Sequence, residues 1–202
     1  MKYLLIDTSS KNLTVAVRNG DVLKTYFDPN CGVNHSVMLM PAVEKTLLEA
    51  GLDLKDVDFL GCTVGAGSFT GIRIGVSTIK ALCYAFNKPC VSLTTFDAIA
   101  YNDLCGKVLA LIDAKHGSFY ACGYDNGEVV FPPSFIDKDT VLEMASEYKL
   151  LSFEDICDLQ TEKVCLKDGL IKAGELKADL KTTDLESLVP LYVRKSQAEE
   201  GR

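Results

Sequence analysis

The stretch YLLIDTSSKNLTVAVRNGDVLKTYF (3–27) has a counterpart later in the chain, VLALIDAKHGSFYACGYDNGEVVFP (108–132). Both start with an apolar run that ends in Ile-Asp, and both continue with residues rich in β-branched and aromatic side chains. Each then turns at Asn-Gly followed by an acidic residue, at 19–21 and at 126–128. Asn-Gly between such runs is a strong hairpin signal, because both residues tolerate positive φ. Each stretch therefore predicts a three-stranded antiparallel meander.

Helical and strand patterns follow the first meander. The segment HSVMLMPAVEKTLLEAG (35–51) has apolar residues at helical spacing and a glycine placed to end the helix. A strand is predicted over 57–65, a helix over about 71–86, and another strand over 90–96. The first half thus has the order β-β-β-α-β-α-β, which differs from the parallel βαβ opening of a dinucleotide-binding fold.

The second half repeats this order in a shorter form. DTVLEMASEYK (139–149) predicts a helix, the residues between 150 and 181 give an ambiguous pattern, and SLVPLYVRKSQAEE (187–200) predicts a short strand with a polar tail. Two β-β-β-α-β-α repeats, each with an acid at the end of its first strand, predict a two-lobe α/β fold of the actin-like, ribonuclease H-like (ASKHA) type. We expect a mixed sheet in each lobe, an N-terminal lobe over 1–104 and a reduced C-terminal lobe over 105–202.

The composition narrows the class of protein. Of the 202 residues, 48% are hydrophobic, which is enough for a packed core and argues against disorder. The net charge of −7 disfavours direct binding to a phosphate backbone. The apolar run at the N-terminus is too short for a signal peptide, and no run is long enough to span a membrane, so we expect a cytoplasmic protein.

The eight cysteines include no C-x-x-C pair, and the chain has two histidines, His35 and His116. Most cysteines lie in apolar runs, as Cys62 and Cys83 do, where a free thiol acts as a small core residue in a reducing compartment. Zinc binding and disulfides are the weaker alternatives. Two histidines can share a metal when they lie four residues apart on a helix, but Leu39 stands four residues after His35. We therefore predict no metal site.

A glycine-rich segment, TVGAGSFTGIRIG (63–75), leads into the second helix. Its spacing is one residue longer than the dinucleotide fingerprint, and it lacks the Gly-Lys-Ser/Thr ending of a P-loop. The acid expected about twenty residues after a dinucleotide loop is missing. One face of the helix is an apolar stripe that predicts packing on a sheet. A second row is mostly small: Gly71, Gly75, Thr78, Leu82 and Ala85. Small residues let another helix approach closely, whether a neighbour in the same lobe or a helix of a partner.

These motifs resemble those of the TsaB (YeaZ) family, related to the TsaD and glycoprotease-like branch of the same superfamily. The matching pieces run in order along the chain: Asp7-Thr8-Ser9, His35-Ser36 with Pro41, Gly65–Gly75, Asp113-Ala114-Lys115 and Pro190–Arg194. Ala66 stands where the family has proline, and the second half is short for the family.

The resemblance implies a subunit that is not itself an enzyme and has no catalytic residues. It implies a role in making threonylcarbamoyl-adenosine in tRNA, by binding and activating the transferase TsaD together with the ATPase TsaE. The tRNA would be reached only through the complex. The N-lobe helices of the two subunits would join as a four-helix bundle. The implied interface residues are Gly71, Arg73, Gly75, Thr78, Leu82, Ala85, His35 and Leu39. A homodimer through the same face stays open.

The repeat also raises the question of a nucleotide cleft. In kinases of this fold a glycine usually follows the first acid, so that the backbone can approach phosphate. Here Asp7 is followed by Thr8 and Ser9, and Asp113 is followed by an alanine and Lys115. Asp7, Thr8, Ser9, Asp113 and Lys115 could form a vestigial cleft, but we favour the alternative that both acids cap turns or bond to backbone N–H groups. We expect no cofactor, with weak ATP or ADP binding at the partner junction as the alternative. An ATPase or kinase of the superfamily and a glycoprotease-like metallopeptidase are the competing functions.

Overall fold

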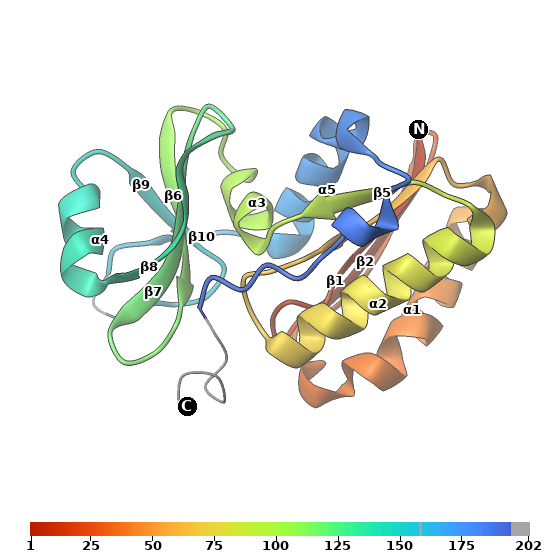
Figure 1. Cartoon of the computed structure of the whole chain (residues 1–202), viewed down its shortest axis with the longest axis horizontal. Coiled ribbons are helices and arrows are strands. Elements are labelled where there is room, and N and C mark those ends of the chain that lie inside the picture. The colour runs from red at the N-terminus through yellow and green to blue at the C-terminus, as the bar shows by residue number, and fades with distance from the viewer. Residues whose placement is uncertain (158, 195–202) are drawn as a thin grey trace.

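The computed structural model describes residues 1–157 and 159–194. It consists of layers in the order helix, sheet, helix, sheet, helix (Figure 1). Each sheet has five strands and an outer helical layer, and the two sheets share an inner layer formed by α3 (Thr95–Ala100) and α5 (Leu166–Leu176). The predicted two-lobe α/β architecture with a mixed sheet in each lobe is confirmed. No helix in the described ranges is long and apolar enough to cross a membrane.

The first sheet has the strand order β3-β2-β1-β4-β5. Its strands and outer helices are β1 (Lys2–Asp7), β2 (Leu13–Asn19), β3 (Val22–Asp28), β4 (Phe59–Thr63), β5 (Cys90–Leu93), α1 (His35–Ala50) and α2 (Phe69–Phe86). The first three strands form the predicted meander, and β4 and β5 add in parallel. The strand β1 is apolar from Tyr3 to Ile6, as a strand with both faces covered must be. Leu4 and Ile6 lie in the outer core under α1 and α2, and Tyr3 and Leu5 lie in the inner core with α5.

The second sheet has the matching order β10-β9-β6-β7-β8. Its elements are β6 (Lys107–Asp113), β7 (Ser118–Asp125), β8 (Glu128–Asp137), α4 (Lys138–Met144), β9 (Lys149–Ser152) and β10 (Glu162–Lys163). Short 3-10 helices are η1 (Gly32–Asn34), η2 (Leu54–Asp56), η3 (Ala178–Leu180) and η4 (Leu185–Ser187). The antiparallel β6-β7-β8 meander and the parallel β6-β9-β10 pairing repeat the first sheet, so the duplication read in the sequence is real.

The two predicted hairpin turns form with different geometry. In the second, Asn126 and Gly127 occupy the two turn positions with φ of 49° and 87°, as a type I′ turn requires. In the first, Asn19 still pairs with Val22, so the turn moves on by one residue and only Gly20 has a positive φ, 61°.

The second repeat lacks one helix. The first repeat places α2 between β4 and β5, whereas the described part of 153–161, between β9 and β10, is irregular. This missing helix is the reduction expected in the second lobe, and it changes the predicted β-β-β-α-β-α order to β-β-β-α-β-β-α. The short strand predicted over 187–200 is not formed in its described part, which is a 3-10 turn and an extended segment. The predicted polar tail lies outside the described residues.

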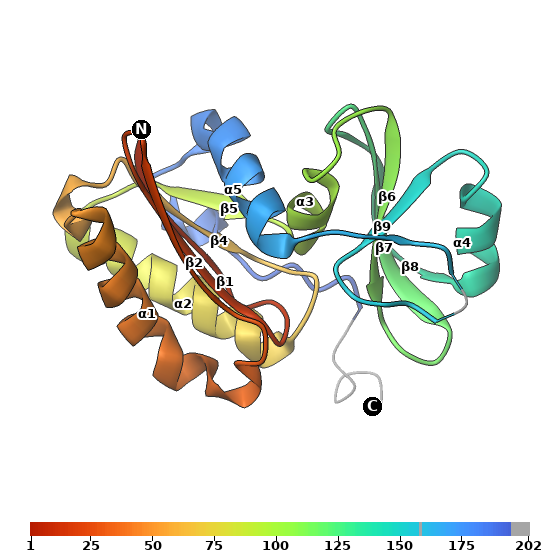
Figure 2. The same cartoon turned by 180° about the vertical axis from the view of Figure 1, so that it is seen from behind.

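The boundary predicted at residues 104 and 105 falls between the two sheets, and one helix from each side of it packs on the other sheet. The helix α5, from the second half, packs on β1, β2 and β5 of the first sheet (Figure 2). The helix α3, from the first half, packs on β6, β7 and β9 of the second sheet. Thr182 also pairs with Cys90 of β5, and Leu188 lies in the outer core of the first lobe. The two halves of the chain therefore exchange a helix.

Candidate functional site

The space beside the glycines before and within α2 is filled by other parts of the same chain. A β-carbon on Gly67 would lie 2.1 Å from the carbonyl oxygen of Ser9, and one on Gly71 would lie 2.0 Å from that of Thr8. Backbone atoms at this distance cannot yield to a side chain, so the turn after β1 requires both glycines. Ser68 also donates its backbone N–H to the Ser9 carbonyl oxygen at 2.7 Å. The β1–β2 turn therefore occupies the space beside these glycines that a bound phosphate would need.

Gly75 faces the same turn one helical turn further on. Its β-carbon would lie 2.6 Å from the hydroxyl oxygen of Thr8, which donates a hydrogen bond of 2.7 Å to the Gly71 carbonyl oxygen. The small residues Gly71 and Gly75 are therefore buried against β1 rather than presented to another helix. Gly71 and Gly75 were predicted to lie in a partner interface, but the close approach that they permit in this structure is internal to the chain.

His35 and Leu39 are also buried in their own lobe. The Nε2 atom of His35 lies 2.9 Å from the carbonyl oxygen of Asn12, and Leu39 belongs to the core under α1. Both residues were predicted to lie on the partner face, whereas in this structure their side chains pack inside the first lobe. His116 lies in the β6–β7 turn with a φ of 55°, far along the chain from His35. Within residues 1–157 and 159–194, no three side chains of His, Cys, Asp or Glu lie close enough to hold a metal.

Asp7 is fully buried and holds the end of β1. Its Oδ1 atom accepts hydrogen bonds from the Ser9 backbone at 2.9 Å and from the Thr63 hydroxyl at 2.5 Å. Its Oδ2 atom and the Ser9 hydroxyl find no hydrogen-bond partner among the residues that the structure describes. One carboxylate oxygen of Asp7 thus stabilises the turn, and the other is buried behind it.

Asp113 stands at the equivalent position of the second lobe but is partly exposed. It accepts a hydrogen bond of 2.8 Å from the Lys115 backbone N–H and forms an ion pair of 2.6 Å with the Lys115 ammonium. Burial raises the pKa of Asp113, but the hydrogen bonds and charge of Lys115 outweigh it and hold the pKa below its usual range. The Lys115 ammonium is thereby occupied by a carboxylate of its own turn.

The two turns meet at a cavity of about 520 Å³ between the lobes. Ser9 and Thr95 line it from the first lobe and the inner layer, and Asp113 and Lys115 line it from the second. Asp7 and Thr8 lie behind its wall, so the structure brings three of the five predicted cleft residues to one cavity. The hydroxyl of Thr95, like that of Ser9, is buried without a partner among the described residues. This cavity can accept a polar group, but it offers no paired nucleophile and base.

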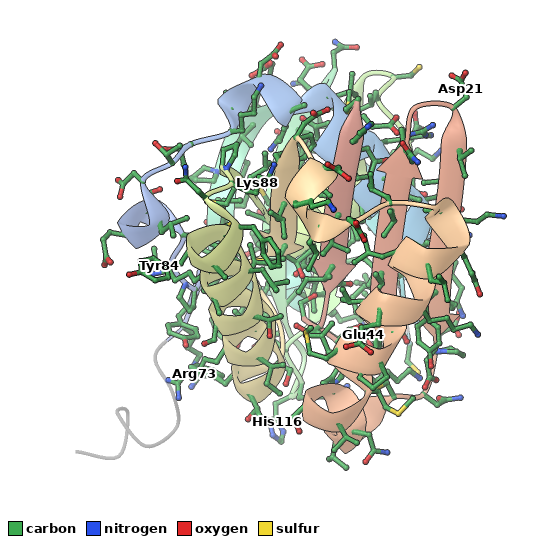
Figure 3. All side chains as sticks on the ribbon, turned by 90° about the vertical axis from the view of Figure 1, so that its right-hand side faces the viewer. Asp21, Glu44, Arg73, Tyr84, Lys88 and His116 are labelled. Atoms are coloured by element: carbon green, nitrogen blue, oxygen red, sulfur yellow. The ribbon has the colours of Figure 1, made fainter. Side chains whose placement is uncertain are left out.

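The outer face of α1 and α2 is the second candidate site. Figure 3 shows the two helices side by side in front of the first sheet, with Glu44 on α1 and Arg73 and Tyr84 on α2. Of the predicted interface residues, Arg73 and Ala85 are exposed, and Thr78 and Leu82 are half-buried.

The exposed row of small residues on α2 consists of Ser77, Ala81 and Ala85, of which only Ala85 was among the predicted interface residues. Their four-residue spacing was present as a signal, but it could not be told from the buried row of Gly71 and Gly75 without knowing which face packs on the sheet.

Comparisons with known proteins agree with this fold. The model of the family TsaD, tRNA N6-adenosine threonylcarbamoyltransferase, matches residues 29–149, more than half of the chain. The tRNA threonylcarbamoyladenosine biosynthesis protein TsaB of Escherichia coli (strain K12) is 28% identical over 98% of this chain and 96% of the relative. TsaB of Bacillus subtilis (strain 168) is 28% identical over the same shares of each chain.

A solved structure supports the fold independently. YeaZ from Pseudomonas aeruginosa superposes with a TM-score of 0.74 and 21% identity, covering 95% of this chain and 99% of that one. This likeness concerns the fold, whereas the family model shows that the chain belongs to the TsaD family, in which its two nearly full-length relatives are TsaB proteins.

Proposed function

We propose that this chain is a non-catalytic subunit in the biosynthesis of threonylcarbamoyladenosine in tRNA, and that the outer face of α1 and α2 binds a TsaD-type transferase. The observation that carries the proposal is the apolar character of this exposed face. Val37 is 69% exposed, Leu48 is 82% exposed and Tyr84 is 84% exposed. Side chains of this size on two neighbouring helices indicate a surface that is covered in a complex.

The arrangement of the face supports packing against other helices. From η1 through α1 an outward stripe recurs every three or four residues: Val33, Val37, Met40, Glu44 and Leu48. On α2 the outward row of Ser77, Ala81 and Ala85 lacks bulk, so a partner helix can approach to about 8 Å. The large side chains of α1 beside the small residues of α2 fit the ridges-into-grooves packing of a four-helix bundle.

The remaining partners follow from the same proposal. The relatives' name connects them with tRNA, yet the net charge of −7 disfavours direct contact with a phosphate backbone. We therefore propose that the transferase supplies the tRNA contact, that a TsaE-type ATPase joins the complex, and that the complex works in the cytoplasm. Homodimerisation through the same face is the alternative state of the chain alone.

A matched pair of substitutions tests the docking face. Ala81→Arg places a charge in the centre of the proposed interface, and we expect the affinity for the TsaD-type partner to fall about tenfold or more, because an unpaired charge would be buried. Ala145→Arg makes the same change at the end of α4, on the opposite outer layer (Figure 1). Affinity is measured by calorimetry on purified chains, with melting curves as the stability control. Equal, unchanged affinity for both variants would refute the docking face.

One observation favours a second function, nucleotide binding by an ATPase or kinase of this fold. Ser9 and Thr95 present unpaired hydroxyl groups at the interlobe cavity. Against it, the glycine loop is filled by the chain's own backbone, and Lys115 is paired with Asp113. Weak ATP or ADP binding at the partner junction is compatible with both functions. Titration with ATP and magnesium decides between them: tight binding that Asp7→Ala abolishes would support the kinase, and its absence supports the subunit.

A further inference from the structure

The closing motif Pro190–Arg194 has no role in the function proposed above. It runs as an extended segment from the first lobe to the second, across the face seen in Figure 1. We call Pro190–Arg194 the strap. Leu191 packs both on the outer core of the first lobe and on the core between the sheets. The strap therefore touches the molecule where the lobes meet.

The first contact of the strap is made by its backbone. The N–H of Leu191 donates a hydrogen bond of 2.7 Å to the carbonyl oxygen of Val64, which follows β4. A β-carbon on Gly65 would lie 2.4 Å from the Leu191 carbonyl oxygen, and Gly65 has a φ of 126°. The first glycine of the loop is thus required by the strap as well as by its own backbone conformation.

The second contact anchors the strap to the start of α2. The ring of Tyr192 stacks on Phe69 with 4.6 Å between centroids and 14° between planes. Arg73 donates a hydrogen bond of 2.8 Å from Nε to the Tyr192 hydroxyl, and its guanidinium lies 5.7 Å from the centroid of the same ring. Stacking, hydrogen bonding and cation–π attraction all converge on one side chain.

The third contact reaches the second lobe. The guanidinium of Arg194 lies 4.9 Å from the ring centroid of Phe135 on β8, and Val193 packs on the core between the sheets. Between the strap, Gly67 and Tyr120 there remains a cavity of only about 10 Å³. Gly67 and Tyr120 also line the interlobe cavity of about 520 Å³. The strap therefore fills one end of the space between the lobes.

We infer that the strap is a latch, which ties the start of α2 to β8, holds the two lobes at one angle and closes one end of the interlobe cavity. Its two ends are held by different chemistry, an aromatic stack on the first lobe and a cation–π contact on the second. A segment that only covered the first lobe would need no anchor on β8. Release of the strap opens the larger cavity at Gly67 and Tyr120, so the latch controls access to the cleft.

A tryptophan reporter tests the latch in the full chain. The sequence contains no tryptophan, so Phe135→Trp introduces a single indole beneath Arg194. In this background, Tyr192→Ala removes the anchor on the first lobe, and Leu180→Ala is the control because Leu180 is exposed in η3, outside both the strap and the docking face. We expect Tyr192→Ala to shift the indole emission, to increase the maximum dimension in X-ray scattering, and to speed exchange of the Leu191 amide about tenfold, the scale of one lost aromatic pair. The control should change none of these.

Two results would overturn the latch. In the first, Tyr192→Ala frees the Leu191 amide but leaves the emission and the scattering curve of the parent, so that the strap covers the first lobe alone. Where Tyr192→Ala fails to fold, Arg194→Gln cuts only the end on the second lobe. It should change emission and scattering while the Leu191 amide stays protected. A scattering curve unchanged by Arg194→Gln would equally reject the proposal.

Discussion

At the scale of the residue, four glycines explain why the segment from Gly65 to Gly75 looks like a nucleotide loop without being built as one. Each of Gly65, Gly67 and Gly71 is opposed by a carbonyl oxygen of the chain itself, and Gly75 by a hydroxyl. In nucleotide loops the missing side chain of glycine lets a phosphate approach the backbone. In this chain it lets the β1–β2 turn and the strap approach instead. The glycines therefore determine packing within the first lobe.

Gly75→Leu separates the internal role from a role in partner binding. The new side chain would collide with Thr8, so we expect the free energy of unfolding to fall by about 1–3 kcal/mol or more. Ala81→Leu adds the same side chain to the exposed face of the same helix and should change stability by no more than about 0.5 kcal/mol. Urea denaturation measures both. Normal stability of Gly75→Leu with lost partner binding would show that the helix–helix interpretation of Gly75 was right after all.

At the scale of the element, the short helix α3 is held between the sheets by a buried carboxylate. Asp97 is 2% exposed, and its Oδ1 atom accepts hydrogen bonds from the Tyr124 hydroxyl of β7 at 2.9 Å and from the Lys177 ammonium after α5 at 2.7 Å. Its Oδ2 atom completes a capping box with Thr94. Burial raises the pKa of Tyr124 well above its usual range, and the charge of Asp97 adds to this. One side chain thus joins the second sheet to both exchanged helices.

Asp97→Ala should be far more damaging than loss of an exposed ion pair. Removing the carboxylate leaves Tyr124 and Lys177 without their acceptor, and breaking a buried pair costs about 3–5 kcal/mol. Glu147→Gln breaks the exposed pair with Lys107 and should leave the melting temperature nearly unchanged, because water screens an exposed ion pair. Thermal melts of both variants provide the comparison. Equal losses of stability would mean that Asp97 does not link the elements as described.

At the scale of the whole molecule, the exchange of α3 and α5 makes the two lobes depend on each other. Residues of both sheets contribute to one core, including Leu5 and Phe59 of the first and Ala110 and Leu151 of the second. We expect a single cooperative unfolding transition, with the calorimetric and van't Hoff enthalpies equal. Two resolved transitions in scanning calorimetry would instead support lobes that fold separately, as a division at residues 104 and 105 implies.

The sequence by itself determined the local structure and the duplication. Alternating and apolar runs, Asn-Gly turns and the glycine after α1 depend on neighbours in the chain, so both meanders, α1 and α2 could be predicted from patterns. The end of β1 and the end of β6 were predicted to face a common cleft, and Ser9, Asp113 and Lys115 do line one cavity. Motif order along the chain was enough to recognise the family.

Only the tertiary structure decided which faces are buried. A row of small residues gives the same sequence pattern whether it packs on its own sheet or on a partner, so the internal contacts of Gly75 and His35 could not be predicted. The same limit hid the exchange of α3 and α5, because an amphipathic helix does not specify which of two apolar sheets it covers. Contacts between residues distant in sequence, such as Tyr192 on Phe69, exist only once the chain has folded, since they depend on where each backbone passes.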